Sequence, residues 1–206
     1  MKDRSAETYG EGGWSAVDRF GIWLSQRAIR RWLPPGNSLE LLELGCGFRA
    51  VQLLAVRDRL KRGTGVDFRI APELLEKGNL SFHQGSIESI LPGLADASYD
   101  VVLLNSVLEH LQDPLAVLLG ARRVLRPGGT LLVNVPTWRG KAFLEFMAFR
   151  LALSPKVEMD DHKMYYGKRD LWPLLVRAGF LPSRIHLFYH KFGLNLFAVA
   201  AASAHG

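Results

Sequence analysis

Two carboxylates and a pair of glycines are the residues of this sequence whose spacing suggests chemistry. Gly45 and Gly47 follow Glu43 at the end of an apolar run, and a helical pattern begins at Ala50. A glycine turn between a strand and a helix lets the backbone approach a nucleotide-like ligand closely. Asp67 stands twenty residues beyond Gly47, where a carboxylate can accept hydrogen bonds from both ribose hydroxyls. The alternative for Asp67 is a helix cap or a surface acid.

Two more polar segments follow apolar, strand-like runs. One is HQGSI at 83–87, in which a small polar side chain could meet a base edge, and the other is NSVLEH at 105–110. In an open parallel sheet, ligands bind at the carboxyl ends of the strands near the switch in strand order. Four such strand ends in this order therefore predict a single nucleotide-like site.

An alternation of strands and helices must position these segments. We expect strands at 39–43, 63–67, 80–83, 99–105 and 130–135. We expect helices at 14–33, 50–60, 72–77, 113–125 and 168–178. Asp113 with Pro114 is a typical helix start, and Gly179 is a typical helix end. The alternation predicts a parallel sheet with right-handed crossovers.

The C-terminal part of the chain breaks the alternation. Two strand-like runs, 185–191 and 194–200, are joined only through Phe192 and Gly193. So short a link requires an antiparallel pair, because a parallel pair needs a long crossover. A hairpin should therefore end a mainly parallel sheet.

Composition narrows the class of protein. With 206 residues and 48% apolar content the chain is expected to form one globular domain. Its single cysteine, Cys46, excludes an internal disulfide framework and fits a reducing compartment. We find no basic-then-apolar leader and no apolar run of roughly 18 residues, so a cytoplasmic location is expected. The net charge of +6 could attract phosphate-bearing partners or anionic lipid, or reflect solvated helix faces, and no sequence-specific nucleic-acid binding is expected.

Taken together, these segments resemble the class I S-adenosylmethionine-dependent methyltransferases, especially the broad small-molecule group. The matching segments are LLELGCG at 41–47, TGVDF at 64–68, YDVVLLNSVLEHLQDP at 99–114, RVLRPGGTLLVNVP at 123–136 and HKMYYGKRDLWPLLVRAGF at 162–180. The resemblance implies an α/β, Rossmann-like fold: a seven-stranded, mainly parallel sheet with a C-terminal antiparallel hairpin and helices on both faces. An N-terminal arm and helix (1–37) would precede the methyltransferase domain (38–206), which would carry an inserted helix around 138–154.

The same resemblance implies S-adenosyl-L-methionine as the cofactor. Glu43 would orient the glycine turn or bind near the methionine amine. Gly45, Cys46 and Gly47 would face the amino-acid part of the cofactor. Asn105 would offer its backbone carbonyl to the amine.

The nucleoside part of the cofactor would lie against the next two strand ends. Asp67 would hold the ribose, with Phe68 against the adenine. Gly85, Ser86 and Ile87 would border the base. Each of these roles is carried over from the family onto the matching position of this sequence.

Two positions depart from the family pattern. Arg49 stands where a third glycine is common, and Ser86 stands where an aspartate is frequent. A serine hydroxyl can still accept a hydrogen bond from an amino group. Arg49 could point outward, pair with the methionine carboxylate, or compromise the pocket.

The expected reaction is in-line methyl transfer to a small-molecule acceptor through an oxygen, nitrogen or carbon atom. Alignment and water exclusion would supply much of the rate. A general base is needed only if the attacking group is protonated. His110 is the first candidate, because it follows the fourth strand and titrates near neutrality. His162 and Tyr165 follow, if their loop folds over the pocket; for all three, packing or a non-catalytic contact is the alternative.

The aromatic stretch 138–153 could wall off a hydrophobic acceptor, pack structurally, or form a dimer contact. Basic residues flanking it would permit shallow membrane contact. No Asn/Asp-Pro-Pro-aromatic turn follows the fourth strand, and no cysteine is placed for pyrimidine C5 methylation. His186 and His190 have no convergent carboxylate, so no metal site is expected. A non-catalytic methyltransferase-fold binding protein and a nicotinamide-dependent oxidoreductase remain as alternatives.

Overall fold

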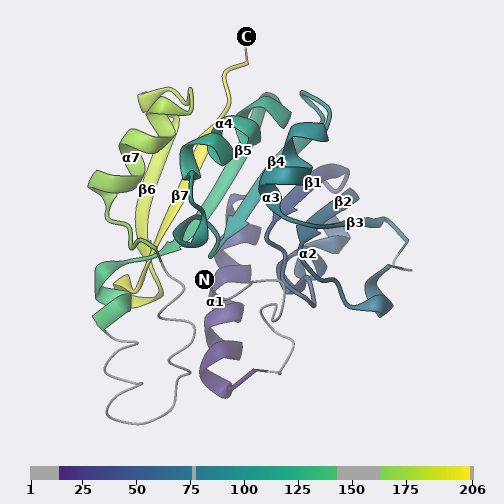
Figure 1. Cartoon of the computed structure of the whole chain (residues 1–206), viewed down its shortest axis with the longest axis horizontal. Helices are drawn as coiled ribbons and strands as arrows, with labels where there is room; N and C mark the ends of the chain where they lie inside the picture. Colours follow the sequence, from purple (N-terminus) through teal and green to yellow (C-terminus); the bar gives the residue numbers. More distant parts are fainter. Residues whose placement is uncertain (1–13, 76–77, 143–162, 205–206) are drawn as a thin grey trace.

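The computed structural model describes residues 14–75, 78–142 and 163–204. Within them the chain forms one seven-stranded sheet in the order β3-β2-β1-β4-β5-β7-β6 (Figure 1). The strands are β1 (Leu39–Leu44), β2 (Leu60–Asp67), β3 (Leu80–Gln84), β4 (Tyr99–Asn105), β5 (Leu125–Pro136), β6 (Ile185–His190) and β7 (Asn195–Ala201). β7 is antiparallel to both β5 and β6, and the other pairs are parallel. The predicted α/β sheet with a terminal hairpin is confirmed.

The strand order places the candidate site. The chain moves outward from β1 to β2 and β3, then returns to place β4 on the other side of β1. The strand order therefore reverses between β1 and β4. Ligands of open α/β sheets bind in the crevice at the carboxyl ends of the strands at such a switch point.

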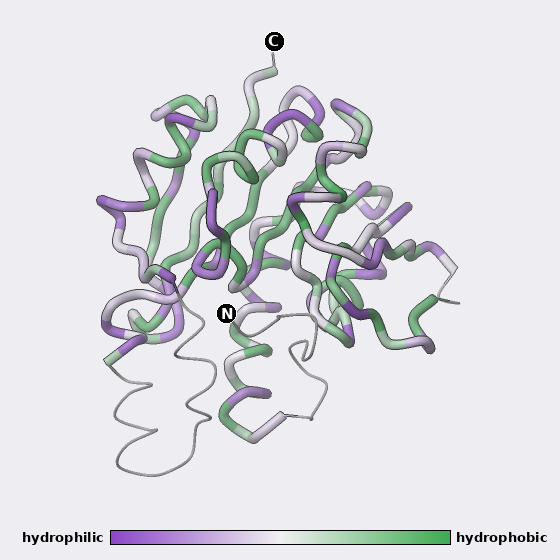
Figure 2. Tube along the Cα trace, viewed as in Figure 1, coloured by the Kyte–Doolittle hydropathy of each residue, from purple (hydrophilic) through white to green (hydrophobic). Residues whose placement is uncertain are grey.

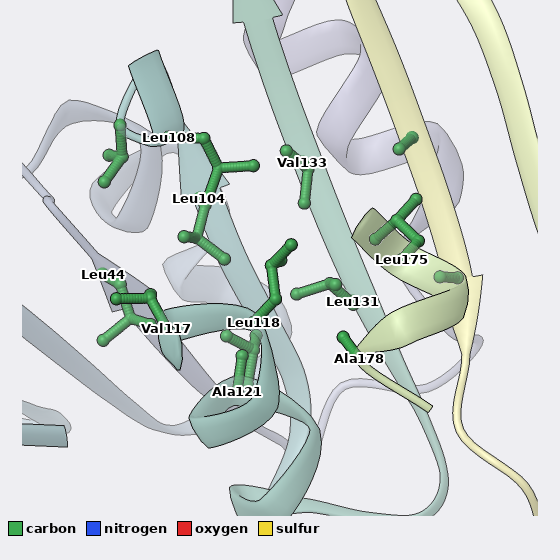
Figure 3. Packing of buried hydrophobic residues seen from close by; sticks show 14 of the residues in the cluster. Leu44, Leu104, Leu108, Val117, Leu118, Ala121, Leu131, Val133, Leu175 and Ala178 are labelled. Atoms are coloured by element: carbon green, nitrogen blue, oxygen red, sulfur yellow. The ribbon is translucent and has the colours of Figure 1, made fainter. Parts of the chain in front are cut away.

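Helices cover both faces of the sheet because the central strands are apolar on both faces, as expected for buried parallel strands (Figure 2). Leu44, Leu104 and Val133 contribute to a cluster with α4 (Pro114–Val124) and α7 (Lys168–Arg177), as Figure 3 shows. Alternate residues point to the opposite face. There, Leu41 and Val101 share a second cluster with residues of α1 (Ala16–Trp32) and α2 (Val51–Ala55).

The predicted helix at 50–60 is wrong in length. Helix α2 ends at Ala55 and a short 3-10 turn, η2 (Arg57–Arg59), follows. The reason lies in sheet register: Leu60 already pairs with Leu39 as the start of β2. Arg59 donates from its guanidinium to the Pro34 and Gly36 carbonyls. The chain must therefore turn into the strand before a longer helix can form.

Two other boundaries differ from expectation. The segment expected as a helix at 72–77 forms a 3-10 turn, η3 (Pro72–Leu74), and residues 76–77 lie outside the described residues. Strand β5 begins at Leu125 rather than at 130, and its pairing with β4 shifts register between Tyr99 and Val101. The Pro-Gly-Gly stretch, with Gly128 at φ +77°, is therefore an irregularity inside the strand and not a turn before it.

The remaining short helices are α3 (Ile87–Ile90), η4 (Leu91–Gly93), η5 (Leu108–His110), η6 (Pro182–Arg184) and η7 (Lys191–Gly193). The predicted helix start at Asp113 and the predicted helix end at Gly179 are confirmed. The Asp113 carboxylate accepts from the Ala116 amide at 3.0 Å, and Gly179 follows α7 at φ +89°.

Residues 138–142 are helical, and 143–154 of the expected inserted helix lie outside the described ranges. The division between an N-terminal arm and helix (1–37) and the following domain (38–206) stays a prediction. Ile29 of α1 and Leu33, the residue after α1, pack in the same cluster as residues of the sheet. None of the helices in the described part is long and apolar enough to cross a membrane.

Candidate active site

The glycine turn after β1 is fastened to β2. Gly45 and Gly47 have φ values of +75° and +72°, a region that side-chain-bearing residues rarely adopt. The Gly45 and Cys46 amides both donate to the Val66 carbonyl, at 2.8 and 3.1 Å. The backbone is therefore folded tightly where β1 ends, with glycines at the positions that need them.

Asp67, at the end of β2, bridges two turns. Its Oδ2 accepts from the Gly47 amide at 2.7 Å, and its Oδ1 accepts from the Phe68 amide at 2.8 Å. The Asp67 carbonyl accepts from the Gly85 amide at 2.9 Å. One residue thus joins the ends of β1, β2 and β3, and 40% of the Phe68 side chain is exposed beside it.

Glu43 is 1% exposed and anchors the helix that follows the turn. Its Oε2 accepts from the Leu53 amide at 3.0 Å, in the first turn of α2. Burial raises the pKa of Glu43 well above its ordinary value; the Leu53 bond opposes this and the Asp67 charge adds to it. Of the two expected roles, this geometry matches orientation of the turn.

Cys46 turns its side chain into the core. The residue is 5% exposed, and its sulfur lies 2.9 Å from the position that a Cβ on Gly65 would occupy. Burial, followed by the charges of Glu43 and Asp67, raises the pKa of the thiol. The Cys46 side chain therefore packs, and only its backbone belongs to the turn.

At the end of β3, Ser86 is the N-cap of α3. Its hydroxyl oxygen accepts from the Ser89 amide at 3.1 Å and its hydroxyl group donates to the Ser89 Oγ at 3.0 Å. Ile87 is 8% exposed. Gly85 and Ser86 are thus held in place beside Asp67, and their predicted contact with a base stays a prediction.

The end of β4 carries backbone strain. The Asn105 Oδ1 accepts from the Asn134 Nδ2 at 3.0 Å, and Ser106 adopts φ +58° while its amide bonds the Asn134 carbonyl. Left-handed conformations of non-glycine residues concentrate at functional sites. Next in the chain, Val107 lies against the glycine turn, since a Cβ on Gly45 would overlap its side chain. The ends of β1 and β4 are therefore in contact.

The segment 163–166 crosses from β4 to β5 at this same edge. The Lys163 amide donates to the Glu109 carbonyl at 2.8 Å, and the Tyr166 amide donates to the Pro136 carbonyl at 3.0 Å. Tyr165 is 4% exposed, and its ring centroid lies 5.5 Å from that of Trp138.

Two of the three base candidates thus lie at the expected edge. Tyr165 is packed there, and His110 is partly buried at the end of η5. His162 lies outside the described residues.

Arg49 points toward the start of α1. Its guanidinium carbon lies 5.7 Å from the centroid of the Trp14 ring, and the residue is exposed. Ala50, the N-cap of α2, takes the left-handed conformation at φ +43°. The chain completes the turn through Ala50, and of the three expectations for Arg49 this geometry matches the outward direction; its part in cofactor binding stays a prediction.

A family model described as a methyltransferase domain matches residues 42–133. The ubiquinone biosynthesis O-methyltransferase of Aeromonas salmonicida is 29% identical over 152 residues, which are 69% of this chain and 63% of that protein. A probable S-adenosylmethionine-dependent methyltransferase of Mycolicibacterium smegmatis is 35% identical over 161 residues, 75% of this chain and 57% of that protein.

Among solved structures, an S-adenosylmethionine-dependent methyltransferase from Thermotoga maritima, described as a possible histamine N-methyltransferase, shares the fold. Its TM-score is 0.66 at 20% identity, over 90% of each chain. The family model and the relatives thus match this chain to the class I S-adenosylmethionine-dependent methyltransferases, whose fold it shares. It spans 63% and 57% of the lengths of the two relatives named above.

The residues of this site fit S-adenosylmethionine, the cofactor named for the matched relative from Mycolicibacterium smegmatis. Gly45 and Gly47 leave the turn without side chains, and the Phe68 ring is partly exposed next to the Asp67 carboxylate. A carboxylate has about four acceptor positions, so Asp67 can hold the turn and also accept bonds from ribose hydroxyls. In the described part of the chain, no cluster of three or more His, Cys, Asp or Glu could hold a metal ion.

Sequence reasoning missed two charged residues of this methyltransferase. Glu109 is 1% exposed in η5, and Lys191 is turned inward from the β6–β7 turn toward its charge. The NSVLEH segment drew attention to the neighbouring His110, and Lys191 was read as the end of a strand. The available signal was a lysine next to Phe192 and Gly193 in the short link between two strand-like runs.

We expect Gly45→Ala to destabilise the methyltransferase more than Gly179→Ala does. Both positions have positive φ, which costs roughly 1–2 kcal/mol for alanine, but only at Gly45 would the new Cβ overlap a side chain, that of Val107. Urea unfolding of both variants checks this. In the double variant Gly45→Ala/Val107→Ala, the stability lost through the overlap should be recovered, and the stability lost through the positive φ should not. Equal losses of stability in Gly45→Ala and Gly179→Ala would contradict this expectation.

Proposed function

We propose that this protein transfers a methyl group from S-adenosylmethionine to a small-molecule acceptor through an oxygen, nitrogen or carbon atom. The observation that carries the proposal is the Asp67 carboxylate, which joins the glycine turn to the end of β2 at the switch in strand order. The relative from Aeromonas salmonicida is named an O-methyltransferase, which favours a hydroxyl acceptor. The location of the activity is proposed to be cytoplasmic, as the sequence predicts.

Each residue of the site has one role in the proposed reaction. When bound, S-adenosylmethionine supplies an electrophilic methyl group. Asp67 accepts from the ribose hydroxyls, Phe68 covers the adenine, and Glu43 keeps α2 and the turn in register. Gly85, Ser86 and Ile87 border the base, and Asn105 presents its carbonyl to the amine. The chain contributes alignment and exclusion of water rather than a covalent step.

A hydroxyl acceptor must lose a proton, and we propose His110 as the group that takes it. His110 is the last residue of η5. Val107, the residue just before η5, lies against Gly45. We expect His110→Asn to lower the transfer rate to a hydroxyl acceptor by about 10²-fold or more. S-adenosylhomocysteine affinity should stay within about two-fold of the original protein; a parallel loss of that affinity would assign His110 a structural part instead. His162 and Tyr165 are the second candidates.

Thermal unfolding with added ligand tests the proposed function. S-adenosylhomocysteine at about a hundred times its dissociation constant adds roughly 2.7 kcal/mol to the folded state, which is seen as a rise in melting temperature. NADH at the same concentration should leave the melting temperature unchanged. A shift with NADH alone would favour the oxidoreductase, which the missing downstream glycine already disfavours.

The second candidate function is a non-catalytic binding protein of the same fold. Its motivation was Arg49, the residue in place of the third glycine. The outward direction of Arg49 over Trp14 supports a working pocket. The binding-protein alternative predicts no shift with either ligand.

A further inference from the structure

The turn between β6 and β7 lies at the same edge of the sheet as the methyltransferase site. Its flanking residues His190 and Asn195 pair with each other, and Asn195 pairs with Pro136, the last residue of β5. Because β7 runs antiparallel to β5, the turn stands at the carboxyl ends of the parallel strands. Figure 1 shows the turn and α1 in the same lower half of the molecule.

In this turn the apolar side chain is exposed and the charged side chain is partly buried. Phe192 is 82% exposed, whereas Lys191 is partly buried. Both residues adopt left-handed conformations, with φ values of +49° and +60°, and each costs roughly 1–2 kcal/mol for a residue other than glycine. An apolar ring outside and a lysine inside is the reverse of the usual order. Strained, inverted segments of this kind concentrate at functional sites.

Contacts with the residues after β5 hold the turn rigidly. The Thr137 amide donates to the Leu194 carbonyl at 2.9 Å, and the Thr137 hydroxyl donates to the Gly193 carbonyl at 2.8 Å. Gly140 lies so close that a Cβ there would overlap the Leu194 carbonyl oxygen. The backbone of the turn is therefore anchored to the segment that follows β5.

The amino group of Lys191 lies against α1, within electrostatic reach of Glu109 in η5. Its Nζ is 3.8 Å from the position that a Cβ on Gly21 would occupy, and Glu109 is the carboxylate that acts on it. Among the described residues no carboxylate lies within ion-pair distance of Lys191. Burial lowers the pKa of Lys191 to about 8, and Glu109 acts in the opposite direction. A partly desolvated ammonium group without a close counter-charge gains free energy when an anion binds.

Segment η5 and helix α1 are also connected to the glycine turn or to the helix that follows it. Glu109 follows Val107, which lies against Gly45. Helix α1 is joined to α2 through a hydrogen bond from the Gln26 Nε2 to the Val51 carbonyl, at 3.2 Å. The amino group therefore lies beside elements that contact the glycine turn or the helix that follows it.

We propose that Lys191 forms an anion-binding subsite of the acceptor pocket, so that the acceptor carries a carboxylate or an acidic hydroxyl. The subsite rests on the proposed function, because it assigns the acceptor of the same reaction. Lys191 would bind and orient the acceptor's anionic oxygen.

Ligand titration into the whole 206-residue chain, saturated with S-adenosylhomocysteine, tests the subsite. The probes are benzoate and its neutral isostere benzamide, and the variants are Lys191→Met and Lys61→Met. Lys61 is the matched control, because it is an exposed lysine on β2. We expect the original protein and Lys61→Met to bind benzoate at least about 10-fold more tightly than benzamide. Lys191→Met should lose this preference and keep its affinity for S-adenosylhomocysteine.

Two results would overturn the subsite. One is equal affinity for benzoate and benzamide in the original protein, and the other is an unchanged preference in Lys191→Met. If Lys191→Met also failed to bind S-adenosylhomocysteine or to fold, Lys191→Arg decides: the subsite requires that the arginine variant retain the benzoate preference, and its loss overturns the assignment. Failure of the original protein to bind S-adenosylhomocysteine would instead defeat the proposed function.

Discussion

Replacement of Asp67 by alanine is expected to weaken S-adenosylhomocysteine binding by at least about 100-fold. The variant would lose two charge-assisted bonds from the ribose hydroxyls to the carboxylate, each contributing roughly 1.5–3 kcal/mol, and also the bonds from the Gly47 and Phe68 amides that hold the turn. Since about 1.4 kcal/mol corresponds to a tenfold change in affinity, two lost interactions give the expected factor. Calorimetric titration of S-adenosylhomocysteine measures it.

Three further variants make this result specific. Asp67→Asn keeps one acceptor oxygen and should lose less affinity than Asp67→Ala. Asp58→Ala removes a surface carboxylate that pairs with Arg30 and should leave binding unchanged. Arg49→Ala should also retain binding, because the arginine points toward Trp14. An equal loss of S-adenosylhomocysteine affinity in all the variants would mean that the Asp67 carboxylate has no specific role in binding.

Replacement of Glu43 by glutamine should change how stability depends on pH. Burial raises the pKa of Glu43 in the folded protein, so between its ordinary pKa and the raised one the folded state binds more protons than the unfolded state. The original protein therefore loses stability as pH rises through that window, by up to about 1.4 kcal/mol per pH unit. Glutamine does not ionise and can still accept from the Leu53 amide.

The stability of Glu43→Gln relative to the original protein should consequently increase with pH above about 4.5, the ordinary glutamate value. Urea unfolding at a series of pH values measures the difference. Glu88→Gln, at an exposed position of α3, is the matched control for the loss of one carboxylate. A flat profile for Glu43→Gln would show that the buried carboxylate keeps its ordinary pKa.

Local physics explains what could be predicted from the sequence. The apolar run of β4, the Asp113 cap and the helix-ending Gly179 depend on neighbours within a few residues, and all three stand where they were expected. The antiparallel hairpin followed from the length of its link alone. The order of the strand ends predicted that Glu43, Asp67 and Asn105 lie at one edge of the sheet, and the strand order agrees with this.

Long-range contacts explain what could not be predicted. Helix α2 is short because Leu60 pairs with Leu39 in the sheet, which the helical pattern of 50–60 does not contain. Arg49 turns outward toward Trp14, a residue far away in sequence. Cys46 points into the core and Lys191 points inward from a strained turn. Each of these directions is set by elements that only the folded chain brings together.

A crystal structure of the protein with bound S-adenosylhomocysteine tests the central claim most directly. The account predicts the ribose hydroxyls within about 2.6–3.2 Å of the Asp67 carboxylate, the adenine against Phe68, and the sulfur facing η5. A ligand bound elsewhere, for example in the groove lined by Trp32 and His186 beside β6, with no contact to Asp67, would contradict it.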